Sequence, residues 1–169
     1  MDKVKLTLRE IALFGILAAL TFGAKVAMSP LPNIEPVSLM VMLYIVVFGR
    51  KALYPIYLYV GMEILFYGIQ LWNINYLYIW LILAFAAWLM RHTESPLAWA
   101  VLSGGFGLLF GALCAPVYLF TGGPAFALSW WLSGIPFDLF HCAGNFVMAL
   151  VLFRPLRALL ERMYRRLSQ

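Results

Sequence analysis

The stretch LAWAVLSGGFGLLFGALCAPVYLF, residues 97–120, contains no charged side chain. A helix needs about 20 consecutive, mostly apolar residues to cross a bilayer, and this stretch is long enough to do so. The whole chain has the same character: of its 169 residues, 64% are hydrophobic and 11% are charged, with a mean hydropathy of +0.91. Soluble domains are about 45–50% apolar and about 25% charged. The composition therefore indicates an integral membrane protein and excludes most soluble enzymes, nucleic-acid-binding domains and disordered chains.

The apolar segments predict an all-α integral membrane protein, a compact bundle of six transmembrane helices in one domain, residues 1–169. The helices are expected at approximately 9–29, 36–49, 52–70, 76–90, 97–120 and 134–153. The first begins after a possible N-cap, Thr7, and is interpreted as a retained helix because no small-residue cleavage site follows it. The second is too short to cross about 30 Å of hydrocarbon alone. We expect residues 125–132 to form an interfacial or re-entrant segment.

The basic residues orient the bundle. Six crossings with both termini in the cytoplasm put 11 of the 12 Lys and Arg residues on the inner side, namely Lys3, Lys5, Arg9, Arg50, Lys51, Arg91, Arg154, Arg157, Arg162, Arg165 and Arg166. The twelfth, Lys25, lies inside the first helix. This asymmetry is typical of membrane proteins in that orientation. The basic, amphipathic tail after Arg154 is expected to lie on anionic lipid of the inner leaflet or to dock a partner protein.

Three charged side chains, Lys25, Glu63 and Asp138, lie at membrane depth. A charge near the centre of a membrane helix costs about 2.5–3.5 kcal/mol on insertion scales, so each must pair, face water or meet a ligand. All three fall in the outer half of the predicted bundle. Asp138, His141 and Asn145 share one helix face, which forms either a polar clamp between helices or the wall of a pocket. Lys25 and Glu63 either neutralise each other or contact a ligand.

These polar residues, together with aromatic residues near the outer boundary, predict a substrate-binding site. The candidates are Lys25, Asn33, Glu35, Glu63, Tyr67, Trp72, Trp131, Asp138, His141 and Asn145. The aromatic residues either form a membrane-interface belt or stack on a flat ligand. Cys114 and Cys142 form no paired motif, so neither a disulfide nor a metal site is expected.

The sequence contains no phosphate-binding loop of the Walker A type. We therefore expect that the chain does not itself hydrolyse ATP by that route. We also expect no cofactor and no catalytic residues. Two alternatives remain: a small intramembrane enzyme that uses Asp138 and His141 for acid–base chemistry on a lipid, and a structural assembly subunit.

Two stripes of small residues occur at a spacing of four. One comprises Gly15, Ala19, Gly23 and Ala27, and the other Ser103, Gly107, Gly111 and Ala115. Small residues at this spacing allow helices to approach closely in lipid. Each stripe either packs inside the bundle or docks a partner subunit, and we expect docking of the stripe in the first helix.

Several features together resemble the substrate-binding S components of energy-coupling factor (ECF) vitamin transporters. These are the size, the six predicted helices, the stripe from Gly15 to Ala27, the loop LPNIEP at 31–36 and the block GIPFDLFHCAGN at 134–145 followed by Arg154-Pro155-Leu156. The resemblance covers essentially the whole chain. The stripe mixes Gly and Ala where an Ala-x-x-x-Ala motif is commonest in the family.

The resemblance implies a multi-pass protein of a prokaryotic cell membrane that binds a vitamin or related micronutrient with high affinity near its outer face. The implied partners are a transmembrane coupling subunit, contacted through the stripe in the first helix, and two cytosolic ATPases that use the ATP. The lipid bilayer is its environment, and no nucleic acid is involved. The loop and the block are most similar to cobalamin-type S components, with riboflavin, folate, thiamine and pantothenate as alternative substrates.

Overall fold

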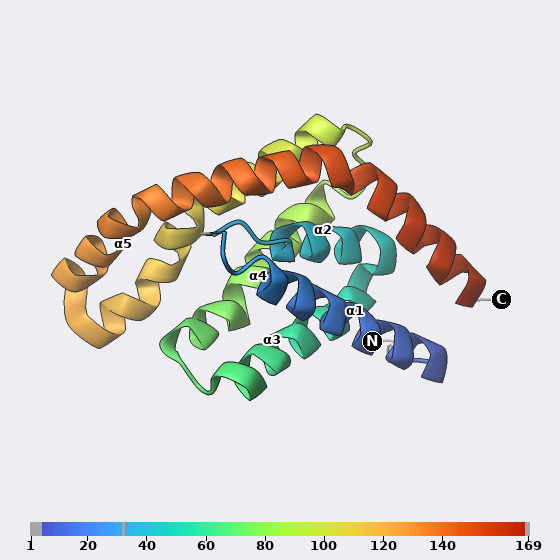
Figure 1. Ribbon diagram of the computed structural model, residues 1–169, viewed down its shortest axis with the longest axis horizontal. Coiled ribbons are helices and arrows are strands. Elements are labelled where there is room, and N and C mark those ends of the chain that lie inside the picture. The colour runs from blue at the N-terminus through green and yellow to red at the C-terminus, as the bar shows by residue number, and fades with distance from the viewer. Residues whose placement is uncertain (1–4, 32, 168–169) are drawn as a thin grey trace.

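The computed structural model describes residues 5–31 and 33–167, and in this part of the chain it contains helices and no strand (Figure 1). The elements are α1 (Leu8–Ala27), α2 (Val37–Phe48), the 3-10 turn η1 (Gly49–Ala52), α3 (Leu53–Tyr67), α4 (Leu71–Leu89) and α5 (Pro96–Leu167). Among the described residues, four helical stretches are long and apolar enough to cross a membrane: Leu8–Ala27, Val37–Tyr67, Leu71–Leu89 and Pro96–Leu167. The predicted all-α class is confirmed, and the length and composition of these stretches are compatible with a membrane protein.

The start of α1 follows from a local signal. Thr7 is its N-cap and accepts a hydrogen bond from the backbone N–H of Glu10, while the Glu10 side chain accepts one from the N–H of Thr7. This capping box satisfies backbone donors that the first helical turn leaves without partners. The expected cap at Thr7 is confirmed, and the helix that it begins ends at Ala27, close to the predicted boundary.

The longest element, α5, is interrupted at Gly123, where φ is 79° and ψ is 178°. Glycine adopts this conformation without the clash that a Cβ would cause. The interruption divides α5 into a first leg, residues 96–122, and a second leg, residues 124–167, which return side by side (Figure 1, yellow-green and orange to red). Residues 125–132, expected as an irregular re-entrant segment, are instead helical and belong to the second leg. The predicted start at 134 was therefore too late.

The short helix α2 lies at the centre of the molecule. Most of its side chains are buried, with Val37, Met42 and Leu43 fully so. It contacts α1, α3, α4 and α5, and its strongest packing is against α4 and α5. A helix enclosed in this way meets protein and not lipid along its length, which explains how a segment too short to cross a bilayer alone is accommodated.

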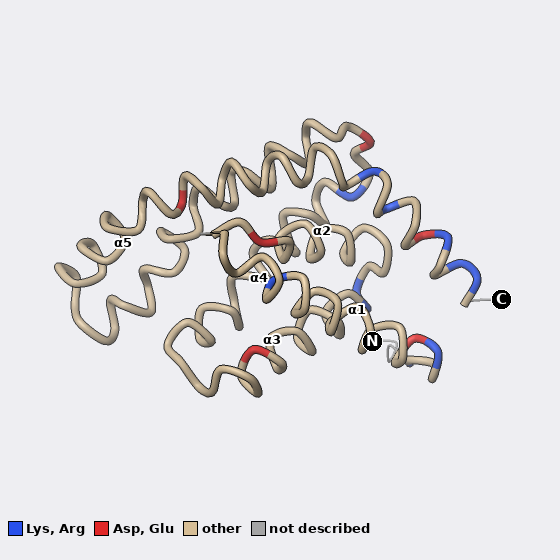
Figure 2. The backbone as a smooth tube through the Cα atoms, viewed as in Figure 1, with Lys and Arg blue, Asp and Glu red and all other residues tan. Residues whose placement is uncertain are grey.

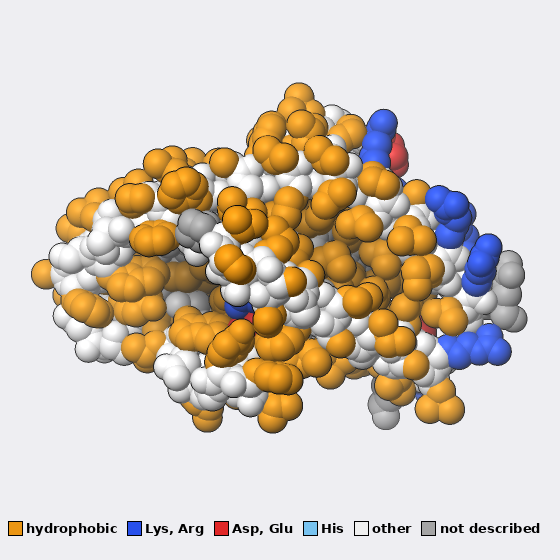
Figure 3. Space-filling model, viewed as in Figure 1, with side chains coloured by type: hydrophobic (Ala, Val, Ile, Leu, Met, Phe, Trp, Pro, Cys, Tyr) orange, Lys and Arg blue, Asp and Glu red, His pale blue; other side chains and the backbone are white. Residues whose placement is uncertain are grey.

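The outer surface is largely apolar, as Figure 3 shows, and includes large side chains such as Leu65 and Phe120 that are 80% and 89% exposed. An apolar surface of this extent fits lipid better than water. Lys and Arg gather at the end of the molecule that holds both chain termini (Figure 2). This is the arrangement that the charge asymmetry of the sequence predicts.

At this basic end, Glu10 connects three elements. Its carboxylate accepts hydrogen bonds from Lys51 Nζ of η1 at 2.5 Å and from the Tyr164 hydroxyl of α5 at 2.7 Å, besides the capping bond from Thr7. A buried carboxylate is tolerated when hydrogen bonds and a counter-charge satisfy it. Glu10 therefore holds the beginning of α1 against the end of α5.

Candidate ligand-binding cavity

A cavity of about 310 Å³ lies between α1, the α1–α2 loop (residues 28–36), α4 and both legs of α5. It is lined by Lys25, Asn33, Glu35, Trp72, Asn75, Tyr76, Phe110, Cys114, Tyr118, Trp130 and His141. Two further cavities, of about 290 and 350 Å³, adjoin it and share Asn33 with it. Figure 3 shows a hollow in the apolar surface with a basic and an acidic side chain at its base. Binding sites for small molecules are commonly apolar cavities with a few polar groups.

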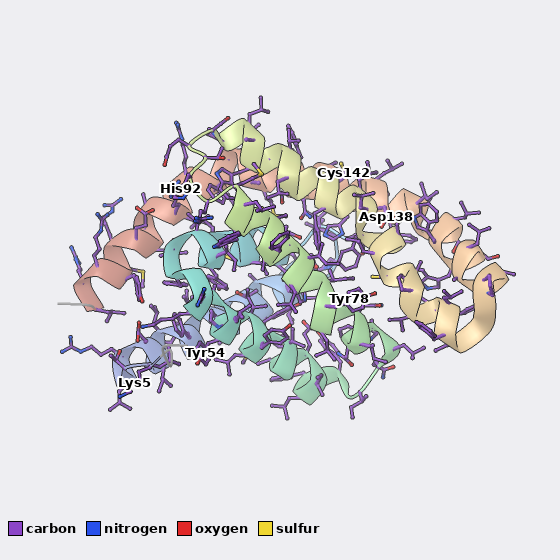
Figure 4. The ribbon with its side chains drawn as sticks, turned by 180° about the vertical axis from the view of Figure 1, so that it is seen from behind. Lys5, Tyr54, Tyr78, His92, Asp138 and Cys142 are labelled. Atoms are coloured by element: carbon purple, nitrogen blue, oxygen red, sulfur yellow. The ribbon has the colours of Figure 1, made fainter. Side chains whose placement is uncertain are left out.

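The cavity lies away from the basic end of the molecule. Figure 4 shows Lys5 and His92 toward one end, and Asp138 and Tyr78 toward the other. The Tyr78 hydroxyl donates its proton to the carbonyl of Leu113 at 2.6 Å, with Asn75 Oδ1 as a second acceptor at 3.1 Å, and the contact with Leu113 fixes α4 against the first leg of α5. The cavity forms between the helices that this contact holds together.

Lys25 enters the cavity from α1 as part of an ion pair. Its Nζ lies 2.9 Å from Glu63 Oε2 and donates a hydrogen bond to the Tyr76 hydroxyl at 3.2 Å. The side chain of Glu63 is fully buried and that of Lys25 is 19% exposed. Glu63 therefore lies behind Lys25 and does not line the cavity. The sequence left two interpretations of this pair: mutual neutralisation or contact with a ligand. Glu63 is placed only to neutralise Lys25, whereas Lys25 is paired with Glu63 and also lines the cavity.

Aromatic rings form most of the remaining wall. Tyr118 and Trp130 stack with their ring centroids 3.9 Å apart and an interplanar angle of 21°, and Trp72 meets Tyr76 edge to face at 5.2 Å. Tyr67 lines the adjoining 290 Å³ cavity and not the first. Trp131 lines none of the three cavities, because neighbouring helical residues point about 100° apart and its neighbour Trp130 takes the inward direction.

His141 lines the cavity from the second leg of α5. The residue is 2% exposed, and its ring meets that of Phe110 in an edge-to-face arrangement with the centroids 4.9 Å apart. Neither ring nitrogen has a hydrogen-bond partner in the described part of the chain. A neutral imidazole carries one donor and one acceptor, and leaving a buried polar group unpaired costs about 1–3 kcal/mol. His141 thus offers two unused polar groups to a molecule in the cavity.

The other two members of the predicted polar face behave differently. Asp138 accepts a hydrogen bond from the backbone N–H of Gly111 at 3.0 Å and lines the adjoining 350 Å³ cavity, and its second oxygen has no partner among the described residues. Asn145 donates to Ser38 Oγ at 3.1 Å and to the carbonyl of Ser103 at 3.3 Å, and it lines none of the three cavities. Asn145 is therefore the interhelical clamp of this face, whereas His141 and Asp138 reach cavities.

The α1–α2 loop forms one side of the cavity. Asn33 has a φ of 53°, a left-handed conformation that Asn tolerates better than most residues. Ile34 packs against Gly144 of α5, where an added Cβ would lie 3.0 Å from Ile34 Cγ2. The partly buried Glu35 projects to the cavity, and burial raises the pKa of its carboxyl above the ordinary 4.5, with Glu63 adding to the increase and Lys25 opposing it. Pro32 lies outside the described residues.

Six lining residues were not among the sequence-based candidates: Asn75, Tyr76, Phe110, Cys114, Tyr118 and Trp130. A signal for three of them exists, since Phe110, Cys114 and Tyr118 follow one another at a spacing of four and so share a helix face. In the residues that the structure describes, no group of three His, Cys, Asp or Glu side chains is placed to hold a metal ion.

The two small-residue stripes differ in their surroundings. Gly15, Ala19, Gly23 and Ala27 are all exposed on α1, and a Cβ added at either glycine would meet no atom within 4 Å. On α5, a Cβ at Gly107 would lie 2.8 Å from the backbone of His141, and one at Gly111 would meet the carboxylate of Asp138. The α5 stripe therefore packs the two legs together, whereas the α1 stripe faces outward.

No known protein family matches this sequence, no curated protein is similar to it, and no solved structure matches it. The function must therefore be inferred from the cavity and its surroundings.

Proposed function

We propose that this protein is the substrate-binding S component of an ECF-type importer, which binds a vitamin-like small molecule and delivers it inward with a coupling subunit and two ATPases. The observation that carries the proposal is the position of His141. Its imidazole is buried, unpartnered in the described part of the chain and directed into a cavity that lies away from the basic end. Such a site, with mostly aromatic walls and a few unused polar groups, is typical of small-molecule binding.

The proposed topology has six crossings with both termini in the cytoplasm. It is supported by the helical segments α1, α2, α3, α4 and the two legs of α5, and by the basic residues at the end that holds both termini. Because basic residues favour the cytoplasmic side, the cavity would then be entered from outside the cell. We propose the cell membrane of a prokaryote as its location.

The size of the cavity bears on the substrate. At about 310 Å³ it is near the lower end of the range of about 300–1,000 Å³ found for ligand sites. Cobalamin or a cobalamin precursor, the substrate that the sequence resemblance favours, would need the adjoining cavities and an outward movement of the α1–α2 loop. Thiamine, riboflavin and pantothenate need less rearrangement.

Binding can be tested by mass spectrometry of small molecules that co-purify with the protein, followed by titration of the molecule identified. Trp130→Ala removes a wall of the cavity and should weaken binding roughly tenfold, since an aromatic contact contributes about 0.5–1.5 kcal/mol beyond its buried area. Trp131→Ala is the matched control because Trp131 does not line the cavity. Equal effects of the two substitutions, or none, would place the ligand elsewhere.

The α1 stripe is the proposed contact for the coupling subunit. Gly23→Leu should abolish uptake in cells that hold the complete transporter and leave ligand binding unchanged, because the space beside Gly23 is open. Gly105→Leu adds the same bulk at an exposed α5 glycine with equally open surroundings and should leave both activities intact. Loss of binding in Gly23→Leu would show that this face belongs to the ligand site.

The intramembrane enzyme receives less support. Acid–base catalysis requires groups within hydrogen-bond reach of one another or of the substrate, and no hydrogen bond joins Asp138 to His141 among the described residues. Turnover of a lipid by the purified protein without any ATPase would favour the enzyme over the transport subunit.

A further inference from the structure

The charges around the cavity do not cancel. The positive charge of Lys25 is matched by Glu63 at 2.9 Å. Glu35 also lines the cavity, and within the described ranges no residue donates a hydrogen bond to it or forms an ion pair with it. Asp138 adds a further acidic group in the adjoining cavity. With Lys25 already paired, the site has an excess of negative charge.

The connecting segments and the adjoining helix ends at this end of the molecule supply no balancing cation. Residues 28–36, 68–75 and 121–133 contain no Lys or Arg. Because the field inside a cavity with low-dielectric walls is focused and weakly screened, a negative excess there attracts cations and disfavours anions. The charge of Glu35 is therefore available to a ligand.

The aromatic walls suit the same kind of ligand. The faces of aromatic rings carry negative partial charge and attract cations within about 6 Å of the ring centroid. Lys25 Nζ already occupies such positions, 5.1 Å from the centroids of both Trp72 and Tyr76. Tyr118 and Trp130, which stack on each other, also line the cavity. A cationic ligand in the cavity would therefore have aromatic rings among its neighbours.

From these observations we infer that the ligand is a compact organic cation, whose charge is balanced by Glu35 and whose body packs against the aromatic walls, with His141 hydrogen-bonded to it. This inference rests on the proposed function, because it concerns the same cavity. It disfavours a carboxylate-bearing ligand, whose negative charge would lie beside Glu35. Among the substrates considered above, thiamine carries a permanent positive charge, whereas riboflavin is neutral and pantothenate is an anion.

The inference is tested by calorimetric titration of the full-length protein in detergent with two cations, thiamine and choline, and with riboflavin, pantothenate and cyanocobalamin. We expect a cation to bind and the anion not to bind. Glu35→Gln should weaken cation binding by about tenfold or more, since removal of a partly buried counter-charge has effects of this size. Glu94→Gln, at the exposed end of the Glu94–Arg157 ion pair, is the matched control and should leave affinity unchanged.

Asn33→Asp provides a test in which the expected result is a gain of affinity and not a loss. It adds a second carboxylate to the same loop and should tighten cation binding, and an unchanged or weaker affinity would contradict the inference. If riboflavin, pantothenate or cyanocobalamin binds and neither cation does, the inference that the ligand is a cation is wrong, while the proposed ligand-binding function is still supported. If none of the five probes binds and no small molecule co-purifies, both the inference and the proposed function are wrong.

Discussion

Two glycines on the first leg of α5, Gly105 and Gly107, should respond in opposite ways to the same substitution. In Gly107→Ala the new Cβ would lie 2.8 Å from both the carbonyl carbon and the oxygen of His141. These are backbone atoms of the second leg, so the two legs must separate to relieve the overlap. Overpacking of this kind costs about 1–3 kcal/mol.

In Gly105→Ala the new Cβ meets no atom within 4 Å, because this side of the helix is exposed. Replacing a mid-helix glycine by alanine then stabilises the helix by roughly 0.5–1 kcal/mol, through the backbone freedom that glycine loses on folding. The same gain applies to Gly107→Ala, so the two variants should differ in their free energy of unfolding by the overpacking cost, about 1–3 kcal/mol. This is about fivefold or more in the unfolding equilibrium constant, since about 1.4 kcal/mol corresponds to a factor of ten.

The assay is reversible unfolding of the purified protein in mixed micelles by increasing mole fraction of sodium dodecyl sulfate, followed by far-ultraviolet circular dichroism. The midpoint should fall for Gly107→Ala and stay level or rise for Gly105→Ala. Gly107→Ala should also weaken ligand binding, because the displaced backbone is that of His141. If both variants unfold at the same midpoint, the two legs do not pack through Gly107.

Three other perturbations have expected outcomes in the same protein. Lys25→Met leaves Glu63 buried without its partner and should lower the free energy of unfolding by about 3–5 kcal/mol. The double variant, Lys25→Met with Glu63→Leu, should recover most of this loss. Equal losses in the single and the double variant would show that the two residues are not coupled. Tyr164→Phe deletes the 2.7 Å hydrogen bond to Glu10 and should lower the free energy of unfolding by about 1.5–3 kcal/mol in the same assay. Ligand affinity should not change, because this hydrogen bond lies at the basic end, away from the cavity. A changed affinity would show that the basic end and the cavity are coupled. Because burial raises the pKa of Glu35 above 4.5, its carboxyl takes up a proton at a higher pH than an ordinary glutamate, so cation affinity should be constant above that raised pKa and fall as the pH is lowered through it. The charged neighbours Lys25 and Glu63 face this group, and a calorimetric pH series in which Glu35→Gln shows the same decline would assign the titration to another residue.

Local features of the sequence were sufficient to predict those parts of the structure that depend only on composition or on neighbouring residues. The scarcity of charge identified the class, and Thr7 marked the start of α1, because an N-cap bonds only to the backbone of its own first helical turn. The association of Lys25 with Glu63 was also foreseeable, since two opposite charges at one membrane depth stabilise each other.

The position of the break in α5 could not be read in the same way. Two Gly/Pro clusters, Gly122-Gly123-Pro124 and Gly134-Ile135-Pro136, carry similar local signals, yet the helix is interrupted at Gly123 and continues through Pro136. A proline is tolerated in a membrane helix when neighbouring groups form hydrogen bonds with the backbone groups that it leaves without a partner. Those neighbours cannot be identified from the sequence alone.

The same limit explains the differences between the candidate residues and those that line the cavity. Whether Trp130 or Trp131 faces inward depends on the rotation of the second leg about its axis, which packing against the first leg determines. The two small-residue stripes have identical spacing, so only the neighbours reveal that Gly107 meets His141 while Gly15 meets nothing within 4 Å. Asn145 shares a face with His141 but lies opposite Ser38 and Ser103, which makes it a clamp.

The burial of α2 has a consequence for the biogenesis of the protein. At about 1.5 Å per residue, its 12 residues rise only about 18 Å, so α2 is a poor substrate for insertion by itself and is expected to enter the membrane as a hairpin with α3. Its largest packing partner, α5, is synthesised only after α3 and α4. The centre of the molecule can therefore close only once α5 has been made, and a nascent chain halted at residue 95 should remain sensitive to protease in the α2 region, whereas a chain that includes α5 should be protected.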